Sequence, residues 1–210
     1  MSVTIYMPRK LAEKHLELFV LAIALFFIGF LIGTVPEYGQ PIIERAREME
    51  LDPYAMIPNF KAIFVNNGAI AAFIWGGWGI APFMGLEYFP PSVMIYNVGA
   101  AFGAVVANTT PLQALLTLAS FGLIEATGFV FALSGGLVLP KYVLMKITGQ
   151  SVVLSEMLRD SFTLLLYGFI ALGSGALLET LLINPITMAV GASGGVVSTF
   201  FFLRFIFSKD

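Results

Sequence analysis

The stretch LELFVLAIALFFIGFLIGTV, residues 16–35, decides the fold class of this chain. Glu17 is its one charged residue, and every other side chain is apolar or small. An α-helix of this length rises about 30 Å, which matches the hydrocarbon thickness of a bilayer. The stretch is too long for the apolar region of a signal peptide and lacks a small-residue cleavage site, so we expect a retained transmembrane helix.

The composition of the whole chain also favours a lipid bilayer as its environment. Of its 210 residues, 58% are hydrophobic and 11% are charged, whereas soluble domains carry about 25% charged residues. The net charge of -2 gives no basic surface for nucleic acid, so we expect lipid and other proteins as partners. Cysteine is absent, which excludes disulfides, thiolate catalysis and cysteine-based metal sites.

Apolar stretches long enough to cross a bilayer recur along the chain, separated by prolines and short polar segments. The sequence predicts an all-α, polytopic membrane protein whose residues 1–210 form one transmembrane domain. The six predicted spans are residues 16–35, 63–82, 92–107, 111–139, 162–183 and 186–207.

Basic residues indicate how these spans are oriented. Lysine and arginine are enriched in cytoplasmic segments, and six crossings place the main basic clusters on one side. We therefore expect a plasma-membrane protein with both termini in the cytoplasm. The residues that lead to this prediction are Arg9, Lys10, Lys14, Lys141, Lys146, Arg159, Arg204 and Lys209.

Two connections are long enough to hold structure of their own. Residues 42–51 place apolar side chains on one helical face, which predicts a short amphipathic helix at the outer surface. Residues 140–160 are predicted to form a cytoplasmic loop in which Ser155 and Glu156 begin the next helix. Pro140 is one of several prolines that we expect at helix ends.

Small residues predict where helices pack closely. Gly99 and Gly103 are four positions apart in the third span, and Gly191 and Gly195 repeat this spacing in the sixth. Such pairs let two backbones approach in a membrane. The pairs are compatible with packing inside one bundle and with a homo-oligomer, so both alternatives remain open.

Polar residues inside the spans are the candidate functional groups. Glu125 lies in the fourth span and Glu179 in the fifth, while three amides, Asn66, Asn67 and Asn97, lie in the second and third. An unpaired carboxylate in hydrocarbon costs several kcal/mol. Glu125 is therefore either neutral and bonded to a carbonyl or an amide such as Asn97, or part of a proton or cation pathway.

Catalytic patterns are missing from the sequence. His15, the one histidine, lies in the basic N-terminal segment and is expected at the membrane interface. The chain contains neither a His-Glu-x-x-His nor a Gly-x-Ser-x-Gly motif, and no phosphate-binding loop. We therefore expect a protein that is not an enzyme and needs no metal or cofactor.

The order of short motifs resembles the stage II sporulation protein M family of integral membrane proteins. The resemblance extends over about residues 16–185. It departs from the family pattern Pro-His-Gly-x-x-Glu-x-Pro, because Ser120, Phe121 and Thr127 replace the first proline, the histidine and the last proline. The motifs that carry it are Ile63-Phe64-Val65-Asn66-Asn67, Asn97 before a glycine pair, Ser120-Phe121-Gly122-Leu123-Ile124-Glu125, and Ala176-Leu177-Leu178-Glu179 followed by Asn184-Pro185.

This resemblance implies a non-enzymatic role. Sporulation members of the family act in a membrane complex with cell-wall hydrolases and localise partners. The first functional hypothesis is accordingly a membrane scaffold for membrane or surface proteins. The second is a small channel or a proton- or ion-coupled transporter that uses Glu125 and Glu179.

Overall fold

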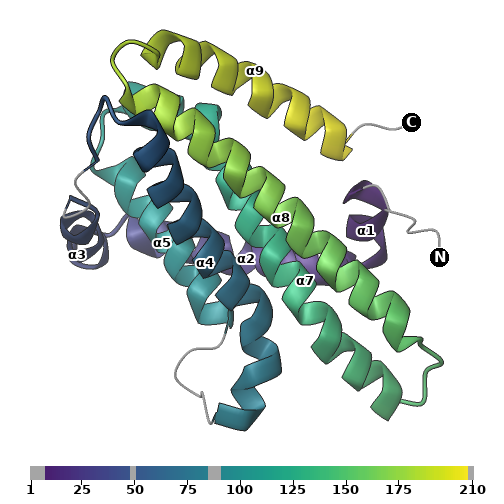
Figure 1. The fold of residues 1–210 in the computed structure, drawn as a ribbon. Helices are drawn as coiled ribbons and strands as arrows, with labels where there is room; N and C mark the ends of the chain where they lie inside the picture. The colour runs from purple at the N-terminus through teal and green to yellow at the C-terminus, as the bar shows by residue number, and fades with distance from the viewer. Residues whose placement is uncertain (1–7, 48–50, 85–90, 208–210) are drawn as a thin grey trace.

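The computed structural model describes residues 8–47, 51–84 and 91–207, and in these ranges the chain is helical with short connections and no strand. A long bundle is formed by α4, α5, α7 and α8, with α2 behind it and α9 along one side (Figure 1). The elements are α1 (Pro8–Lys14), α2 (Leu16–Gly33), α3 (Pro36–Arg47), α4 (Met56–Met84), α5 (Pro91–Ala107), α6 (Pro111–Thr117), the π-helical turn η1 (Leu118–Gly122), α7 (Leu123–Ile147), α8 (Leu154–Ile183) and α9 (Met188–Phe207).

Helices α2 and α5 run parallel and touch through their backbones. A Cβ atom added to Gly99 or Gly103 would overlap the carbonyl oxygen of Phe26 or Phe30, respectively, on α2. Gly29 approaches α5 in the same way. Close contact of this kind is how helices gain packing energy where lipid removes the hydrophobic drive between them.

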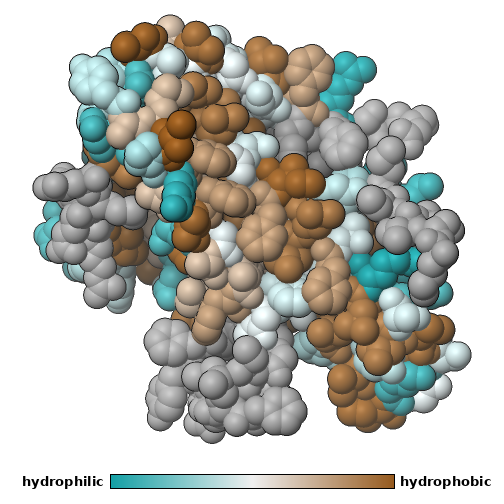
Figure 2. Space-filling view, viewed as in Figure 1, coloured by the Kyte–Doolittle hydropathy of each residue, from teal (hydrophilic) through white to brown (hydrophobic). Residues whose placement is uncertain are grey.

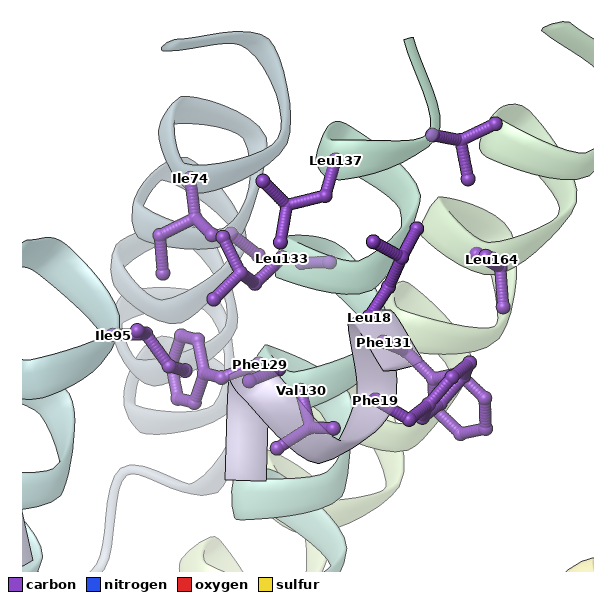
Figure 3. Close-up of a cluster of buried hydrophobic side chains, with 14 of the residues drawn as sticks. Leu18, Phe19, Ile74, Ile95, Phe129, Val130, Phe131, Leu133, Leu137 and Leu164 are labelled. Atoms are coloured by element: carbon purple, nitrogen blue, oxygen red, sulfur yellow. The ribbon is translucent and has the colours of Figure 1, made fainter. Parts of the chain in front are cut away.

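The antiparallel pair α7 and α8 forms the centre of the bundle, with α4 packed against both. Buried side chains from α2, α4, α5, α7 and α8 meet in one apolar cluster (Figure 3). Its labelled members are Leu18, Phe19, Ile74, Ile95, Phe129, Val130, Phe131, Leu133, Leu137 and Leu164.

Helix α9 folds back after a tight turn at Asn184, whose side-chain oxygen accepts the N–H of Ile186 at 2.9 Å. Gly191 then packs on the last turns of α8. Gly195 packs on Ser120 of η1, where a Cβ atom added to the glycine would lie 2.7 Å from the Cβ of Ser120. All four glycines that the sequence identified for packing therefore contact other helices of the same chain.

Two predicted boundaries are wrong. Pro140 lies inside α7, which continues to Ile147, so most of the predicted loop 140–160 is helical. The proline removes one backbone hydrogen bond but leaves its fixed φ compatible with a helix. Helix α3 covers residues 36–47, earlier than the predicted range 42–51, and residues 48–50 lie outside the described part of the chain.

Three helical segments within the described residues are long and apolar enough to cross a membrane: Leu16–Gly33, Pro111–Ile147 and Leu154–Ile183. Val93–Ala107 and Met188–Phe201 are shorter apolar helices. The chain is therefore an all-helical protein with the features of a membrane protein.

The glycine contacts predict a position-specific effect of adding one methyl group. Gly99→Ala should lower the free energy of unfolding by about 1–3 kcal/mol, because the new Cβ overlaps backbone atoms that cannot rotate away. Gly76→Ala is the matched control, since nothing lies within 4 Å of its added Cβ. Thermal unfolding of the purified protein in detergent measures both. Equal melting temperatures for the two variants would contradict the proposed packing.

Candidate functional site

Glu125 lies in the first turn of α7 and is 5% exposed. Its side chain lies directly against Gly175 of α8. A Cβ added to Gly175 would overlap Glu125 Cγ and would lie 3.1 Å from its Cδ and 3.2 Å from its Oε1. Glycine at this position therefore creates the space that the buried carboxyl group occupies.

A chain of amides connects this carboxyl group to the surface. Asn67 Nδ2 donates a hydrogen bond of 2.9 Å to Glu125 Oε1. Asn66 Nδ2 donates in turn to Asn67 Oδ1 at 3.3 Å, and Asn66 is exposed. Because the two asparagines are consecutive on α4, one side chain reaches the interior while its neighbour faces outward.

Glu179 of α8 joins Glu125 at a cavity of about 200 Å³. A second cavity of about 290 Å³ shares Glu179, Thr117 and Phe121 with the first and extends to Ile183 at the end of α8. Glu179 is half-buried between the two. The two cavities share these lining residues and lie near the end of the bundle that holds the α8–α9 turn.

The π-helical turn η1 immediately precedes Glu125. Leu123 N–H bonds to Leu118 O, five residues back, instead of to the carbonyl four residues back. The hydroxyl group of Thr199 on α9 donates a hydrogen bond of 3.5 Å to Ser120 O. Single π turns inside α-helices are frequent at functional sites, because they rotate the residues that follow. Here the turn directly precedes the buried carboxyl group.

The structure brings together four of the five predicted polar residues. Asn66, Asn67, Glu125 and Glu179 form one site on α4, α7 and α8. Asn97 lies exposed on α5, and no described hydrogen bond joins it to Glu125. The amide partner of Glu125 is Asn67, because α4 packs on α7 beside the carboxyl group.

A second polar cluster, which sequence reasoning missed, lies at the opposite end of the bundle. His15, for which the sequence predicts a position at the membrane interface, is 1% exposed, and Asp160 is 0% exposed. Asp160 Oδ2 accepts from Lys14 Nζ at 2.5 Å and lies 3.1 Å from His15 Nε2. Lys141 pairs with Glu17 beside them. Opposite charges placed near the same ends of neighbouring spans are the sequence signal that identifies this cluster.

Burial is the main cause of a lowered pKa at His15. The positive charges of Lys141 and Lys14 lower this pKa further, while the hydrogen bond and negative charge of Asp160 act in the opposite direction. The combined effect favours the neutral imidazole.

Comparison with protein-family models finds no match, and comparisons with curated proteins and with solved structures find none either.

The contact between Gly175 and Glu125 predicts energetic coupling between the two positions. Gly175→Ala should destabilise the protein by about 1–3 kcal/mol, because the added Cβ overlaps the Glu125 side chain. In Glu125→Ala, the same Gly175→Ala change should cost much less. Thermal unfolding of the two single variants and the double variant gives the coupling.

Gly173→Ala is the control on the same helix, since its added Cβ meets Phe64 at an ordinary distance of 3.4 Å. Strictly additive effects of Gly175→Ala and Glu125→Ala would show that the carboxyl group does not occupy the space at Gly175.

Proposed function

We propose that the protein is a small proton-coupled membrane transporter or channel in which Glu125 and Glu179 bind and release the proton. The observation that carries this proposal is the meeting of two carboxyl groups, from two helices, at one cavity. Ionisable residues are costly inside a membrane span, and they mark proton and ion pathways when they face a cavity.

Access to the pair supports a pathway that opens on one side. The two cavities lead from Glu125 past Glu179 toward the α8–α9 turn. In the other direction, the α7 side chains from Gly128 to Val138 are all buried in tightly packed protein. Such an arrangement corresponds to one state of an alternating-access cycle, in which the opposite side is closed by packed side chains.

The chemistry of the site favours a proton over a metal ion. Mg²⁺ and Ca²⁺ require six or more oxygen ligands. Within the described residues no group of three or more acidic, histidine or cysteine side chains could hold a metal. Asn67 also directs an N–H donor toward Glu125, which suits a carboxyl oxygen more than a metal site. A proton needs no coordination shell and can move between carboxyl groups through a few water molecules.

We further propose six crossings with both termini in the cytoplasm. Helices α2 and α5 run parallel, as expected for the first and third of alternating spans, while α7 and α8 run antiparallel. Lys14, Lys141 and Arg159 cluster at one end of the bundle, which supports a cytoplasmic location of that end. The carboxyl pair then opens toward the outer side.

Proton flux into liposomes tests the proposal. Reconstituted protein with a trapped pH-sensitive dye should conduct protons when a membrane potential is imposed. Glu125→Gln and Glu179→Gln should each reduce this flux at least tenfold, because an amide cannot exchange the proton. Glu156→Gln changes an exposed carboxyl group at the start of α8 and is the control. Flux that is the same in all three variants as in the unmodified protein would rule out the carboxyl pair as the pathway.

A membrane scaffold is the second candidate, as the resemblance to the stage II sporulation protein M family implies. The observation in its favour is an apolar patch at the tip of the α7–α8 hairpin, which Figure 2 shows beside hydrophilic residues. Its exposed side chains are Val143, Leu144, Ile147, Val153 and Leu154. In the proposed topology this tip is cytoplasmic, where a partner protein can cover it.

Capture of a stoichiometric partner from native membranes tests the scaffold function. Ile147→Glu should abolish that capture, because it places a charge on a patch residue that is 77% exposed. Leu112→Glu is the control, since Leu112 is exposed at the other end of the bundle. Equal capture by both variants would exclude the hairpin tip as the docking surface.

A further inference from the structure

The chain's one histidine lies where three separate segments meet. His15 connects α1 to α2, contacts Lys141 of α7 through Nδ1, and contacts Asp160 of α8 through Nε2. It is 1% exposed. This cluster lies at the opposite end of α7 and α8 from the carboxyl pair, so it is separate from the proposed proton pathway.

The two neighbours of the imidazole determine its protonation state. A lysine ammonium group has three N–H donors and no lone pair, so it can only donate. Lys141 Nζ lies 3.3 Å from Nδ1, which must therefore be an unprotonated acceptor. Asp160 Oδ2 lies 3.1 Å from Nε2 and accepts its N–H. The geometry assigns a neutral ring with its proton on Nε2.

We propose that His15 is a proton-operated latch, in which protonation of Nδ1 replaces the hydrogen bond from Lys141 with a repulsion and releases α1 from α7 and α8. Lys141 cannot adapt by reversing the bond, because it has no acceptor. It also bonds to Glu17 and, at 3.4 Å, to the carbonyl oxygen of Lys14. The same ammonium thus holds the ring and the backbone next to it.

The charges around the ring determine the direction of the response. Lys14 from α1, Lys141 from α7 and Asp160 from α8 act on it directly. Glu17 of α2 pairs with Lys141, and Glu156 of α8 lines the same cavity as His15. A proton on His15 adds a positive charge beside two lysines in a region where Asp160 is fully buried, and low polarity strengthens the repulsion between these cations.

Water can deliver this proton. A cavity of about 240 Å³ is lined by His15, Lys14, Lys141 and Ser151, next to the start of α8. Helix α1 is held by the buried side chains of Pro8 and Leu11, by contacts with α8 and α9, and by this cluster. Loss of the Lys141 bond therefore removes one of the contacts that keep α1 in place.

The expected pH dependence follows from linkage. In the released state His15 has the pKa of an exposed histidine, about 6.5, whereas burial and the lysine charges lower the pKa in the attached state. Attachment is therefore unaffected by pH above about 6.5. Below that value the released fraction rises by up to about tenfold per pH unit, until the pH reaches the pKa of the attached state.

Nitrogen NMR of the unmodified chain tests the protonation state directly. Because the chain contains one histidine, ¹⁵N-histidine labelling of protein without a histidine tag, in lipid nanodiscs, reports on His15 alone. The expected result at pH 7.5 is a neutral ring that is protonated at Nε2. A charged ring, or a proton on Nδ1, at that pH would overturn the proposal.

Cysteine labelling tests the release of α1. The chain has no cysteine, so Leu11→Cys reports exposure of the buried face of α1, and Ser155→Cys serves as the exposed reference. The ratio of their maleimide labelling rates should rise at least fivefold between pH 7.5 and pH 5.5. His15→Gln should remove this dependence, because glutamine does not titrate.

Lys141→Gln should raise the labelling ratio already at pH 7.5 and weaken its pH dependence, because the bond that protonation breaks is lost in advance. Lys146→Gln, on the same helix but over the ring of Tyr142 at 5.9 Å, should change neither. A flat labelling ratio in the unmodified background, or an unchanged pH response in His15→Gln, would show that His15 does not control α1.

Discussion

The close approach of α7 and α8 is the contact on which the rest of the structure depends. A glycine of one helix meets the other helix at three levels. Gly128 opposes Gly168, and Gly175 lies against Glu125. A Cβ atom added to Gly135 would lie 2.8 Å from the carbonyl oxygen of Ser161. Lipid removes the hydrophobic drive between helices, so this backbone proximity is what makes their association specific. The remaining helices pack around the pair.

The same pair carries a polar cluster at each end. Near one end Glu125 and Glu179 share a cavity, and near the other Asp160 binds Lys14 and His15. Between them the α7 residues from Gly128 to Val138 are buried, and Ser134 is the one polar residue among them. Polar groups are tolerated within such a bundle only where they have partners or reach water. The apolar centre therefore separates the two clusters along the bundle.

Much of the architecture could be predicted from the sequence because it follows from local properties. Each predicted span overlaps a helix of the structure, and three helical segments of the described residues are long and apolar enough to cross a membrane. Asn67, Glu125 and Glu179 do meet. Asn97 failed as a partner because its position on the α5 surface depends on the rotation of that helix against α2, which spacing alone does not determine. The burial of His15 could not be predicted for a similar reason, since it is produced by α7 and α8, more than a hundred residues later.

The sequence by itself determined that the chain is helical and apolar enough for a membrane, and that Glu125 and Glu179 are unusual within it. These properties belong to the residues and to their order, so no packing information is needed to see them. Only the tertiary structure decided which amide bonds to Glu125, which side chain fills the space at Gly175, and which charged groups surround His15. Each of these depends on a distance between helices, and such distances arise from how the whole bundle packs.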